Sequence, residues 1–395
     1  MLKEEVIQTD QDYFMNVFGK RFPIVLERGE GVCLYDNEGV EYLDFAAGIA
    51  VNALGYKHPQ VTEALKEQVE KLLHASNLYY FEIQAKLSKL LVENSCGDKV
   101  FYGNSGAEAN EGAIKLARKY FKEQGQEKYE VITAKESFHG RTLSTLAATG
   151  QTKYQKAFTP LPKGFKHVSY NDLNAAQKAI TKQTAAIMVE PIQGEGGVNP
   201  AQKEYLQGLR ELCDQAGILL IFDEIQTGIG RTGDLFAYQT YGVEPDIVTL
   251  AKALGNGMPI SAFLAKDRVA DAFKPGDHAS TFGGNPLACR AAYATLQVIL
   301  EDGFLKKVKE VGAYFRERLE QLAVQYDSVV EVRGKGLMIG VELKISAKEV
   351  VGKLLDGGVL ALTAGENVLR FLPPLIITTE DVDQLVKSLD RILAE

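Results

Sequence analysis

The feature that most constrains the fold is a series of short apolar runs that alternate with stretches of helical period. Three of these runs, at 185–191, 218–223 and 246–252, carry apolar residues at consecutive positions rather than at every second one. Strands of this kind are covered on both faces, which is typical of parallel sheets joined by helical crossovers. Between the first two runs, apolar residues recur at helical spacing: Tyr205, Leu209, Leu212 and Cys213. We therefore expect an α/β fold with a mainly parallel sheet and helices on both faces.

The two ends of the chain have a different pattern. Near the N-terminus, two strand-like runs flank the turn residues 37–39 and predict a hairpin. Towards the C-terminus, two long helical patterns precede further short strand runs and a last helix. We expect an N-terminal arm and hairpin at 1–50, a large domain at 51–286 and a smaller C-terminal α/β domain at 287–395. The N-terminal part is expected to belong to the smaller lobe.

Composition and charge exclude several classes of function. The formal net charge of −8 argues against a general affinity for nucleic acid or an anionic membrane. The four cysteines are far apart and form no C-x-x-C pair, so neither a zinc site nor a disulfide framework is expected. No apolar segment reaches the roughly 18 residues of a membrane span, and the first residues lack the apolar run of a signal peptide. We expect a cytoplasmic protein that acts on small molecules.

Candidate catalytic residues stand where two of the predicted strands end. The stretch "LLIFDEIQ" places Asp223 directly after four apolar residues, and Lys252 closes the next strand-like run. Open parallel sheets bind ligands at the carboxyl ends of their strands, so these two side chains are expected to meet there. An ordinary structural ion pair is the alternative for an Asp and a Lys placed in this way.

Two loops add to this pattern. Residues 105–107 lie between a strand-like run and a helix, where free N–H groups favour a phosphate, although a plain Ser-Gly helix cap looks the same. The stretch "ESFHGRTLS" places Phe138, His139 and Arg141 in one loop. Taken singly, Phe138 is most simply a core residue and His139 a satisfied polar residue. A phosphate anchor, an aromatic face, a carboxylate and a lysine amine are together the contacts expected for pyridoxal 5'-phosphate.

At this point the sequence resembles the class III pyridoxal-phosphate-dependent aminotransferases. The resemblance is carried, in order along the chain, by "NSGAEANEGAIKLAR", "SFHGRT", "VEPIQGEGG", "LLIFDEIQTGIGRTG", "PDIVTLAKALGNGMPI" and "STFGGNPLA". It extends over almost the whole chain. It implies the fold-type-I architecture, in which a large domain with a mainly parallel sheet of seven-stranded type is joined to a smaller C-terminal α/β domain. It also implies pyridoxal 5'-phosphate as cofactor.

The resemblance implies a role for each matching residue. Lys252 is expected to form the Schiff base with the cofactor aldehyde and to shuttle protons, and Asp223 to pair with the pyridine nitrogen. Further cofactor contacts in the same subunit are implied for Ser105, Gly106, Ala107, Phe138, Glu224, Ile225 and Gln226. Thr281 of the partner subunit is expected to reach the phosphate, which implies a homodimer with shared active sites. No metal is implied.

The same resemblance implies two unlike substrates. Arg141 and Ser280 are expected to hold the carboxylate and acylamino end of N-acetyl-L-ornithine. Arg370 is expected to bind the α-carboxylate of glutamate or 2-oxoglutarate. Glu195 is expected to neutralise Arg370 when no such carboxylate is bound. The implied reaction is transamination of N-acetyl-L-ornithine with 2-oxoglutarate, a step of arginine biosynthesis that gives N-acetyl-L-glutamate 5-semialdehyde and L-glutamate.

Other interpretations stay open on the sequence alone. N-Succinylornithine, N-succinyl-diaminopimelate and 4-aminobutyrate are alternative donors, because each combines an ω-amine with a distant carboxylate. A pyridoxal-phosphate-binding regulatory protein on the same fold is a non-enzyme alternative, and a scaffold with purely structural motif residues is another. Lys252 argues against a regulator, since binding alone needs no proton shuttle. Two residues depart from the family pattern: Ala107, where relatives often have Thr, and Ile49, where enzymes that act on free ornithine have Tyr.

Overall fold

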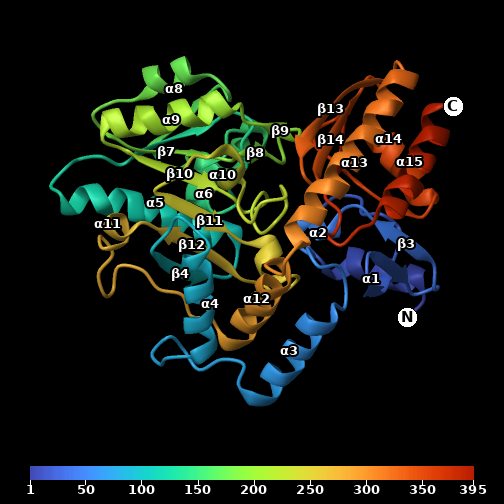
Figure 1. Cartoon of the computed structure of the whole chain (residues 1–395), viewed down its shortest axis with the longest axis horizontal. Coiled ribbons are helices and arrows are strands. Elements are labelled where there is room, and N and C mark those ends of the chain that lie inside the picture. The colour runs from blue at the N-terminus through green and yellow to red at the C-terminus, as the bar shows by residue number, and fades with distance from the viewer.

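The computed structural model describes residues 1–395, and its centre is a seven-stranded sheet (Figure 1). In spatial order the strands are β4 (Lys99–Gly103), β12 (Ser261–Ala265), β11 (Ile247–Leu250), β10 (Leu219–Asp223), β7 (Thr184–Val189), β5 (Glu130–Ala134) and β6 (Phe165–Val168). Neighbours from β11 to β6 are parallel, and β12 is antiparallel to both of its neighbours. The mainly parallel sheet expected from the apolar runs is confirmed.

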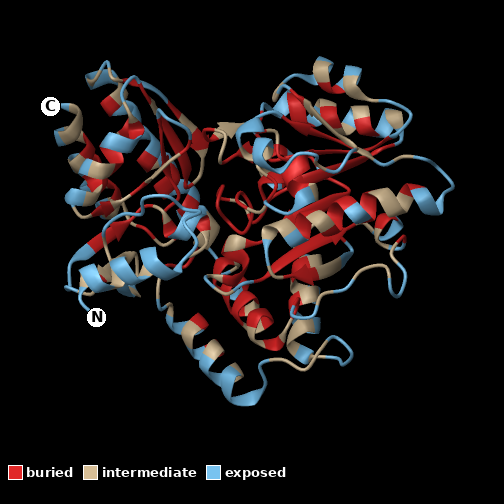
Figure 2. Cartoon of the chain, turned by 180° about the vertical axis from the view of Figure 1, so that it is seen from behind, coloured by how far each residue is buried: buried red, intermediate tan, exposed pale blue.

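Helices cover both faces of this sheet, and β10 shows why its sequence is apolar throughout. Leu219 packs in a cluster with α5 (Gly106–Glu123), whereas Phe222 belongs to a second cluster together with α9 (Lys203–Ala216). Successive side chains of a strand point to opposite faces, so a strand covered on both faces needs apolar residues at every position. Figure 2 shows the strands as a buried layer between helices that are exposed on their outer sides.

The remaining helices of this part are mostly short. They are α6 (Leu143–Ala148), α7 (Thr152–Gln155), α8 (Leu173–Ala179), α10 (Ala237–Tyr241) and α11 (Asp267–Ala270). Three longer helices pack together at one end of the molecule, since α12 (Pro286–Ile299) lies against α3 (Pro59–Lys71) and α4 (Glu82–Glu93) (Figure 1). No helix combines the length and the apolar character that crossing a bilayer requires.

A second unit contains the C-terminal segment and the N-terminal strands. Its antiparallel sheet has the order β13 (Val329–Lys335), β14 (Met338–Leu343), β17 (Val368–Phe371), β16 (Leu362–Thr363), with helices α13 (Phe304–Gln325), α14 (Ala347–Asp356) and α15 (Thr379–Leu393). The predicted hairpin is present as β2 (Cys33–Asp36) and β3 (Glu41–Asp44), flanked by β1 (Leu26–Glu30). Strand β15 (Val359–Leu360) pairs with β3, which ties the N-terminal strands to the C-terminal segment. Helix α1 (Lys3–Tyr13) precedes them.

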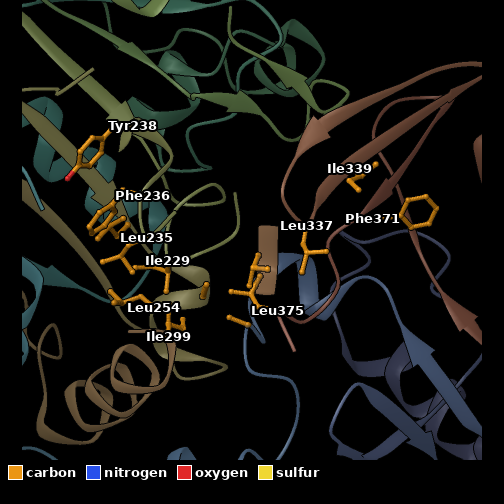
Figure 3. Packing of buried hydrophobic residues seen from close by; sticks show 14 of the residues in the cluster. Ile229, Leu235, Phe236, Tyr238, Leu254, Ile299, Leu337, Ile339, Phe371 and Leu375 are labelled. Carbon is orange, nitrogen blue, oxygen red and sulfur yellow. The ribbon is translucent and has the colours of Figure 1, made fainter. Parts of the chain in front are cut away.

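The two units share one continuous core. Figure 3 shows Ile229 and Leu254 on the side of the large sheet, with Leu337 and Phe371 on the other side, and all belong to the same buried cluster. The fully buried Arg231 crosses this boundary, because its Nη1 donates to the carbonyls of Leu337 (3.1 Å) and Pro373 (2.5 Å). Burial lowers the pKa of Arg231 to about 9. The relative position of the two units is therefore fixed by both apolar packing and buried hydrogen bonds.

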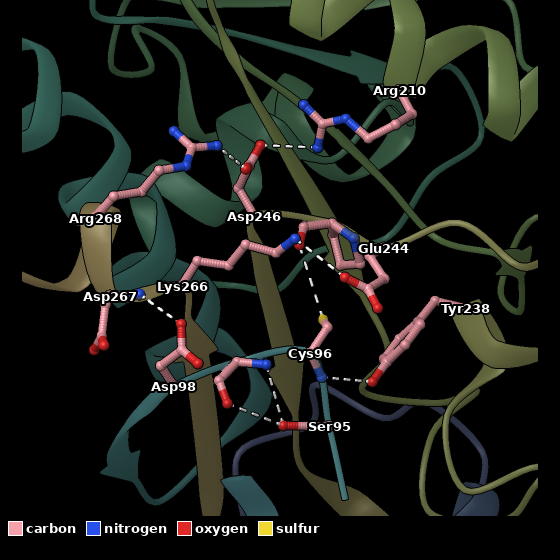
Figure 4. A network of polar contacts seen from close by, with 12 residues as sticks. Ser95, Cys96, Asp98, Arg210, Tyr238, Glu244, Asp246, Lys266, Asp267 and Arg268 are labelled. Atoms are coloured by element: carbon pink, nitrogen blue, oxygen red, sulfur yellow. Dashed lines mark hydrogen bonds and ion pairs between the residues drawn. The ribbon is translucent and has the colours of Figure 1, made fainter. Parts of the chain in front are cut away.

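A buried carboxylate, that of Asp246, fixes the amino ends of strands β10 and β11. Asp246 stands just before β11, accepts the N–H of Leu220 at 2.8 Å and pairs with Arg210 of α9 at 2.9 Å. It also pairs with Arg268 of α11 (Figure 4). Because this one carboxylate bonds to β10 and to helices α9 and α11, it holds these elements together at the amino ends of strands β10 and β11.

Close packing of α5 on the sheet leads to a stability prediction. A Cβ at Gly112 would overlap the ring of Phe263 on β12, so Gly112→Ala is expected to lower the free energy of unfolding by about 1–3 kcal/mol. Gly352 in α14 is the matched control, because a Cβ there meets no atom within 4 Å. Gly352→Ala should raise stability by about 0.5–1 kcal/mol. Urea unfolding midpoints measure both changes, and shifts of the same sign would contradict the prediction.

Candidate active site

A cavity of about 440 Å³ lies at the edge of the large sheet where the parallel strands end. Loops after β4, β5, β7, β10 and β11 all reach it, because the carboxyl ends of parallel strands share one edge. Strand β12 runs the other way, so the segment before it reaches the same edge. Of the residues singled out in the sequence, the cavity is lined by Ser105, Gly106, Ala107, Phe138, Arg141, Glu195, Asp223, Ile225, Gln226 and Lys252.

Lys252 lies two residues beyond β11, where the 3-10 turn η2 (Lys252–Gly255) begins. Its φ of 44° is in the left-handed region, which is strained for a residue with a side chain and is typical of functional sites. Burial lowers the pKa of Lys252 to about 8, with the charge of Arg370 acting in the same direction and that of Glu195 against it. A larger share of this amine is therefore neutral near neutral pH than of an exposed lysine, about a tenth at pH 7.

The Asp223 carboxylate is buried and held by three donors. His139 Nδ1 lies 2.7 Å from Asp223 Oδ2, Asn110 Nδ2 donates to the same oxygen at 2.8 Å, and the N–H of Ile225 donates to Oδ1 at 3.1 Å. A carboxylate only accepts, so Nδ1 of His139 carries a proton. Burial disfavours the imidazolium, but the hydrogen bond and the charge of Asp223 outweigh burial and raise the pKa of His139. The carboxylate is thus fixed in orientation.

Glu190 is a second buried carboxyl group on the cavity wall. Its Oε2 accepts the N–H of Phe138 at 3.1 Å and its Oε1 that of Gly194 at 3.4 Å, so it joins two loops of the site. Burial raises the pKa of Glu190. The sequence prediction missed Glu190 and Asn110, and it singled out His139 without giving it a role at the site. Glu190 follows an apolar strand directly, which is the pattern that identified Asp223, whereas nothing local distinguishes Asn110.

The first turn of α5 forms an anion cradle. Ser105 caps the helix, because its Oγ accepts the N–H of Glu108 at 3.3 Å. The next N–H groups, those of Gly106 and Ala107, have no acceptor within the helix and lie at the cavity. A Cβ at Gly106 would come within 2.8 Å of Ile225, so only glycine lets the helix approach the Asp223 loop this closely.

Polar and aromatic side chains complete the wall opposite the cradle. Phe138 and Arg141 both line the cavity, and the guanidinium of Arg141 lies 4.1 Å from the ring centre of Tyr154. Gln226 packs against Gly194, and its Oε1 is buried without a hydrogen-bond partner. An unsatisfied buried acceptor costs free energy unless a ligand or a water donates to it. The Gln226 oxygen is therefore available to a ligand.

A buried ion pair joins the cavity to the second unit. Arg370, on β17, donates from Nη1 to Glu195 Oε1 at 2.5 Å, and its side chain is only 4% exposed. Burial opposes ionisation of Glu195, but the charge and hydrogen bond of Arg370 prevail and lower the pKa of Glu195. The sequence placed these two residues together, and the structure brings them into contact although 175 positions separate them.

Besides Arg370, three residues expected at the site lie outside the cavity lining. The Glu224 carboxylate instead accepts the N–H groups of Ala237 and Tyr238 at 2.6 and 2.7 Å, so it holds the start of α10. Ser280 Oγ accepts from Asn104 at 3.3 Å, next to the cavity wall. Thr281 is exposed on the surface. The last two do not reach the cavity of their own chain.

A strained turn borders the cavity near Lys252. The short helix α2 (Ala47–Ala50) has positive φ throughout, including 66° at Ile49, and it precedes Val51 of the cavity wall. Buried Asp44 holds its start by accepting the N–H groups of Ala46 and Ala47 at 2.8 and 3.0 Å. Consecutive left-handed residues cost of order 1–2 kcal/mol each. Such strain persists only where the surroundings determine the conformation, as this carboxylate does.

No group of three or more His, Cys, Asp or Glu side chains is arranged to hold a metal ion. The arrangement of amine, oriented carboxylate, anion cradle and aromatic wall instead matches a known family. The chain matches the family described as aminotransferase class-III over residues 14–393, and it belongs to that family. Its architecture is the fold-type-I one that the sequence resemblance implied.

Similar proteins identify a narrower group. The acetylornithine aminotransferases of Caldanaerobacter subterraneus and Methanocaldococcus jannaschii are 54% and 53% identical to this chain, over 99% and 100% of it and 99% of each relative. Among solved structures, the acetylornithine aminotransferase of Elizabethkingia anophelis superposes with a TM-score of 0.90 at 36% identity, over 99% of both chains. The ornithine aminotransferase of Toxoplasma gondii superposes with a TM-score of 0.95 at 36% identity, over 99% of this chain and 96% of that one.

The residues of the cavity fit the cofactor of this family, pyridoxal 5'-phosphate. A second T. gondii ornithine aminotransferase structure has this cofactor at partial occupancy in its active site. In the present chain, the unpaired N–H groups of Gly106 and Ala107 suit a phosphate, and Asp223 offers an oriented carboxylate to a ring nitrogen. Lys252 supplies the amine and Gln226 the unsatisfied acceptor. The protein is thus a pyridoxal-phosphate-dependent aminotransferase that acts on small molecules.

The pKa of Lys252 predicts how the protein captures its cofactor. Only the neutral amine attacks an aldehyde, so the capture rate should rise with pH and reach half of its maximum at a pH of about 8. Rapid mixing of cofactor-free protein with pyridoxal 5'-phosphate, followed by absorbance, measures this rate. Lys252→Ala is the control, which should show no covalent absorbance change. A rate that does not vary with pH through this range would contradict the prediction.

Proposed function

We propose that this protein transfers the δ-amino group of N-acetyl-L-ornithine to 2-oxoglutarate, giving N-acetyl-L-glutamate 5-semialdehyde and L-glutamate. The observation that carries the proposal is the Glu195–Arg370 pair beside Lys252. One cavity must accept a donor that brings only an amine to the reacting centre and an acceptor that brings a carboxylate as well. The names of several similar proteins support the same substrate.

Two residues carry the proton and charge chemistry in this proposal. When bound, the cofactor supplies a reactive aldehyde carbon and a ring that accepts electrons. Lys252 would hold the cofactor through its Nζ, and the same nitrogen, when free, would take the proton from the donor's amine-bearing carbon. Its lowered pKa suits a base that works near neutral pH. Asp223, oriented by its hydrogen bonds with His139 and Asn110, would face the ring nitrogen.

The remaining cavity residues bind and orient the cofactor. Gly106 and Ala107 donate their N–H groups to the phosphate beside the Ser105 cap, and Ile225 supports this turn from behind. The ring of Phe138 would stack on the cofactor ring, and Gln226 would contact the ring hydroxyl. Ala107 lacks the hydroxyl of the Thr that relatives often have, so the phosphate relies on backbone donors.

Substrate discrimination follows from charge pairing. While the donor reacts, Arg370 has no substrate carboxylate, and a buried guanidinium without a partner would be costly. Glu195 supplies the missing charge, and it gives way when the α-carboxylate of glutamate or 2-oxoglutarate arrives. Arg141, which lines the cavity, and Ser280, which lies next to the cavity wall, are proposed to hold the donor's carboxylate and acylamino group.

A panel of donors tests the proposal. N-Acetylornithine, N-succinylornithine, N-succinyl-diaminopimelate, free ornithine and 4-aminobutyrate are each supplied with 2-oxoglutarate, and kcat/KM is measured from glutamate formation. N-Acetylornithine should exceed free ornithine and 4-aminobutyrate by at least about tenfold, because the acylamino contacts are then satisfied. The two succinylated donors should be closer, since acyl groups that differ by a few atoms are discriminated weakly. A preference for 4-aminobutyrate or for no donor at all would refute the proposal.

A homodimer with shared sites is also part of the proposal. Five apolar side chains on two segments are exposed: Leu73, Leu78, Tyr79, Tyr80 and Phe282, of which Tyr80 is fully exposed and Phe282 is 60% exposed. The two segments are adjacent, because Asn77 donates to the carbonyls of Ser280 and Gly283 at 3.2 and 2.8 Å. Exposed apolar side chains on adjacent segments favour an interface. Thr281 lies within it, so it is free to reach the site of the partner subunit.

Subunit mixing tests the shared site. Lys252→Ala removes the amine, and Thr281→Asp places a negative charge where the partner's phosphate would bind, so each homodimer should be inactive. A heterodimer of the two contains one site with intact Lys252 and intact Thr281, and it should recover about half of the wild-type activity per dimer. Two affinity tags allow the heterodimer to be isolated and assayed. An active Thr281→Asp homodimer, or an inactive verified heterodimer, would count against sharing.

A further inference from the structure

The turn that carries Glu195 is short and rich in glycine. Strands β8 (Ile192–Gln193) and β9 (Asn199–Pro200) form a hairpin, and residues 194–198 are its turn. Three of these five residues are glycines, and such a turn has many accessible conformations. Within the hairpin, Asn199 Nδ2 donates to the carbonyl of Gly196 at 2.9 Å. Contacts from outside the hairpin therefore decide where the Glu195 carboxylate lies.

Glu190 accepts the N–H of Gly194 and Gln226 packs against Gly194, and the other contacts come from a single row of the second sheet. Arg333 of β13 is directly opposite Gly340 of β14, and Gly340 is directly opposite Arg370 of β17. Directly opposite residues of antiparallel strands project from the same face. With strands about 4.8 Å apart, the two arginines stand about 10 Å apart on that face. Gly340 leaves a gap between them.

The Glu195 turn fits this row at three points. Arg333 Nε donates to the carbonyl of Gly197 at 3.0 Å, and Arg370 pairs with Glu195 at 2.5 Å. Between them, buried Val198 fills the gap over Gly340, because a Cβ on Gly340 would lie only 2.8 Å from the Cβ of Val198. The backbone and the carboxylate of one turn are thus held by neighbouring positions of one sheet.

Arg333 is itself held in place. Its Nη1 pairs with Glu342 Oε2 at 2.5 Å and with Glu331 Oε2 at 2.8 Å, and its side chain is 14% exposed. These two carboxylates leave Nε directed at the carbonyl of Gly197. A guanidinium oriented in this way is a fixed donor rather than a mobile surface charge.

We infer that Arg333 and Gly340 are positioning residues that set how strongly Glu195 competes with substrate carboxylates for Arg370. The inference rests on the proposed function, in which Glu195 and the α-carboxylate of glutamate or 2-oxoglutarate alternate on Arg370. Neither Arg333 nor Gly340 lines the cavity. Both act through the turn, by raising the fraction of molecules in which Glu195 covers Arg370.

Loosening the turn has opposite effects on the two substrates. When Glu195 covers Arg370 less often, a dicarboxylate finds Arg370 free more often and binds more tightly. The half-reaction with N-acetylornithine then becomes slower, because Arg370 is left without a partner while this donor reacts. A residue that only stabilised the fold would impair both half-reactions together.

Two variants of the row test the inference in the holoenzyme. Arg333→Met removes the donor to Gly197 and keeps a long side chain, and Gly340→Ala pushes Val198 out of its gap. Titration calorimetry with glutarate, an unreactive dicarboxylate, should give dissociation constants about five- to tenfold lower than wild type. Single-turnover absorbance should show the N-acetylornithine half-reaction slowed by a similar factor, with the glutamate half-reaction unchanged or faster.

Glu331→Gln is the matched control. It removes one exposed ion pair of Arg333 but leaves Glu342 and the contact with Gly197, so wild-type values are expected. Unchanged or weaker glutarate binding in Arg333→Met overturns the inference, as does an equal loss of both half-reactions. If Gly340→Ala fails to fold, glutarate binding and the two half-reactions of Arg333→Met alone decide whether the inference holds.

A reference variant separates this inference from the proposed function. Glu195→Gln removes the competing carboxylate itself and should show the same pattern as Arg333→Met, at least as strongly. If Glu195→Gln leaves glutarate binding and the ratio of the two half-reactions unchanged, the alternation on Arg370 is wrong. If Glu195→Gln shifts them and Arg333→Met does not, the alternation stands and the positioning role of Arg333 is refuted.

Discussion

The charged groups around the cavity are largely removed from water, and the pairing of these charges is the constraint on which the site depends. An isolated buried charge costs several kcal/mol, so each must find a counter-charge or a set of hydrogen bonds. Asp223 is paired with His139, and Arg370 is paired with Glu195. Lys252 has no contacting carboxylate, and burial accordingly lowers its pKa to about 8. The one amine left without such a partner is the one whose neutral form the chemistry needs.

This constraint also explains why the two units are joined so firmly. Arg370 belongs to the second sheet while Glu195 belongs to a turn beside the first, so their pairing requires a fixed relative position of the units. The continuous core and the buried Arg231, bonded to two carbonyls across the boundary, supply it. A buried ion pair of this kind is a poor source of stability. Its value here lies in being exchangeable, because a substrate carboxylate can replace that of Glu195.

Conformational strain is concentrated next to the reacting groups. Lys252 and the left-handed turn at Ala47–Ala50 both have backbone conformations that cost free energy in an ordinary protein segment. Each is held by its surroundings: the buried Asp44 fixes the turn, and the end of β11 fixes the approach to Lys252. The rigid sheet therefore stabilises conformations that its loops would not adopt alone, and it does so at the edge where all the loops meet.

The sequence by itself determined the class of fold and the residues on single loops. Unbroken apolar runs such as Leu219–Asp223 indicate burial on both faces of a strand, and a carboxylate or lysine that follows a parallel strand of this kind lies at the ligand-binding edge. The motif resemblance added the association of Glu195 with Arg370. Only the tertiary structure decided that His139 and Asn110 orient Asp223, that Glu224 turns away to cap α10, and that Arg333 and Arg370 share one row. The physical reason is that periodicity reports on the faces of one element, whereas side-chain contacts between elements depend on strand order and register, which no local pattern encodes.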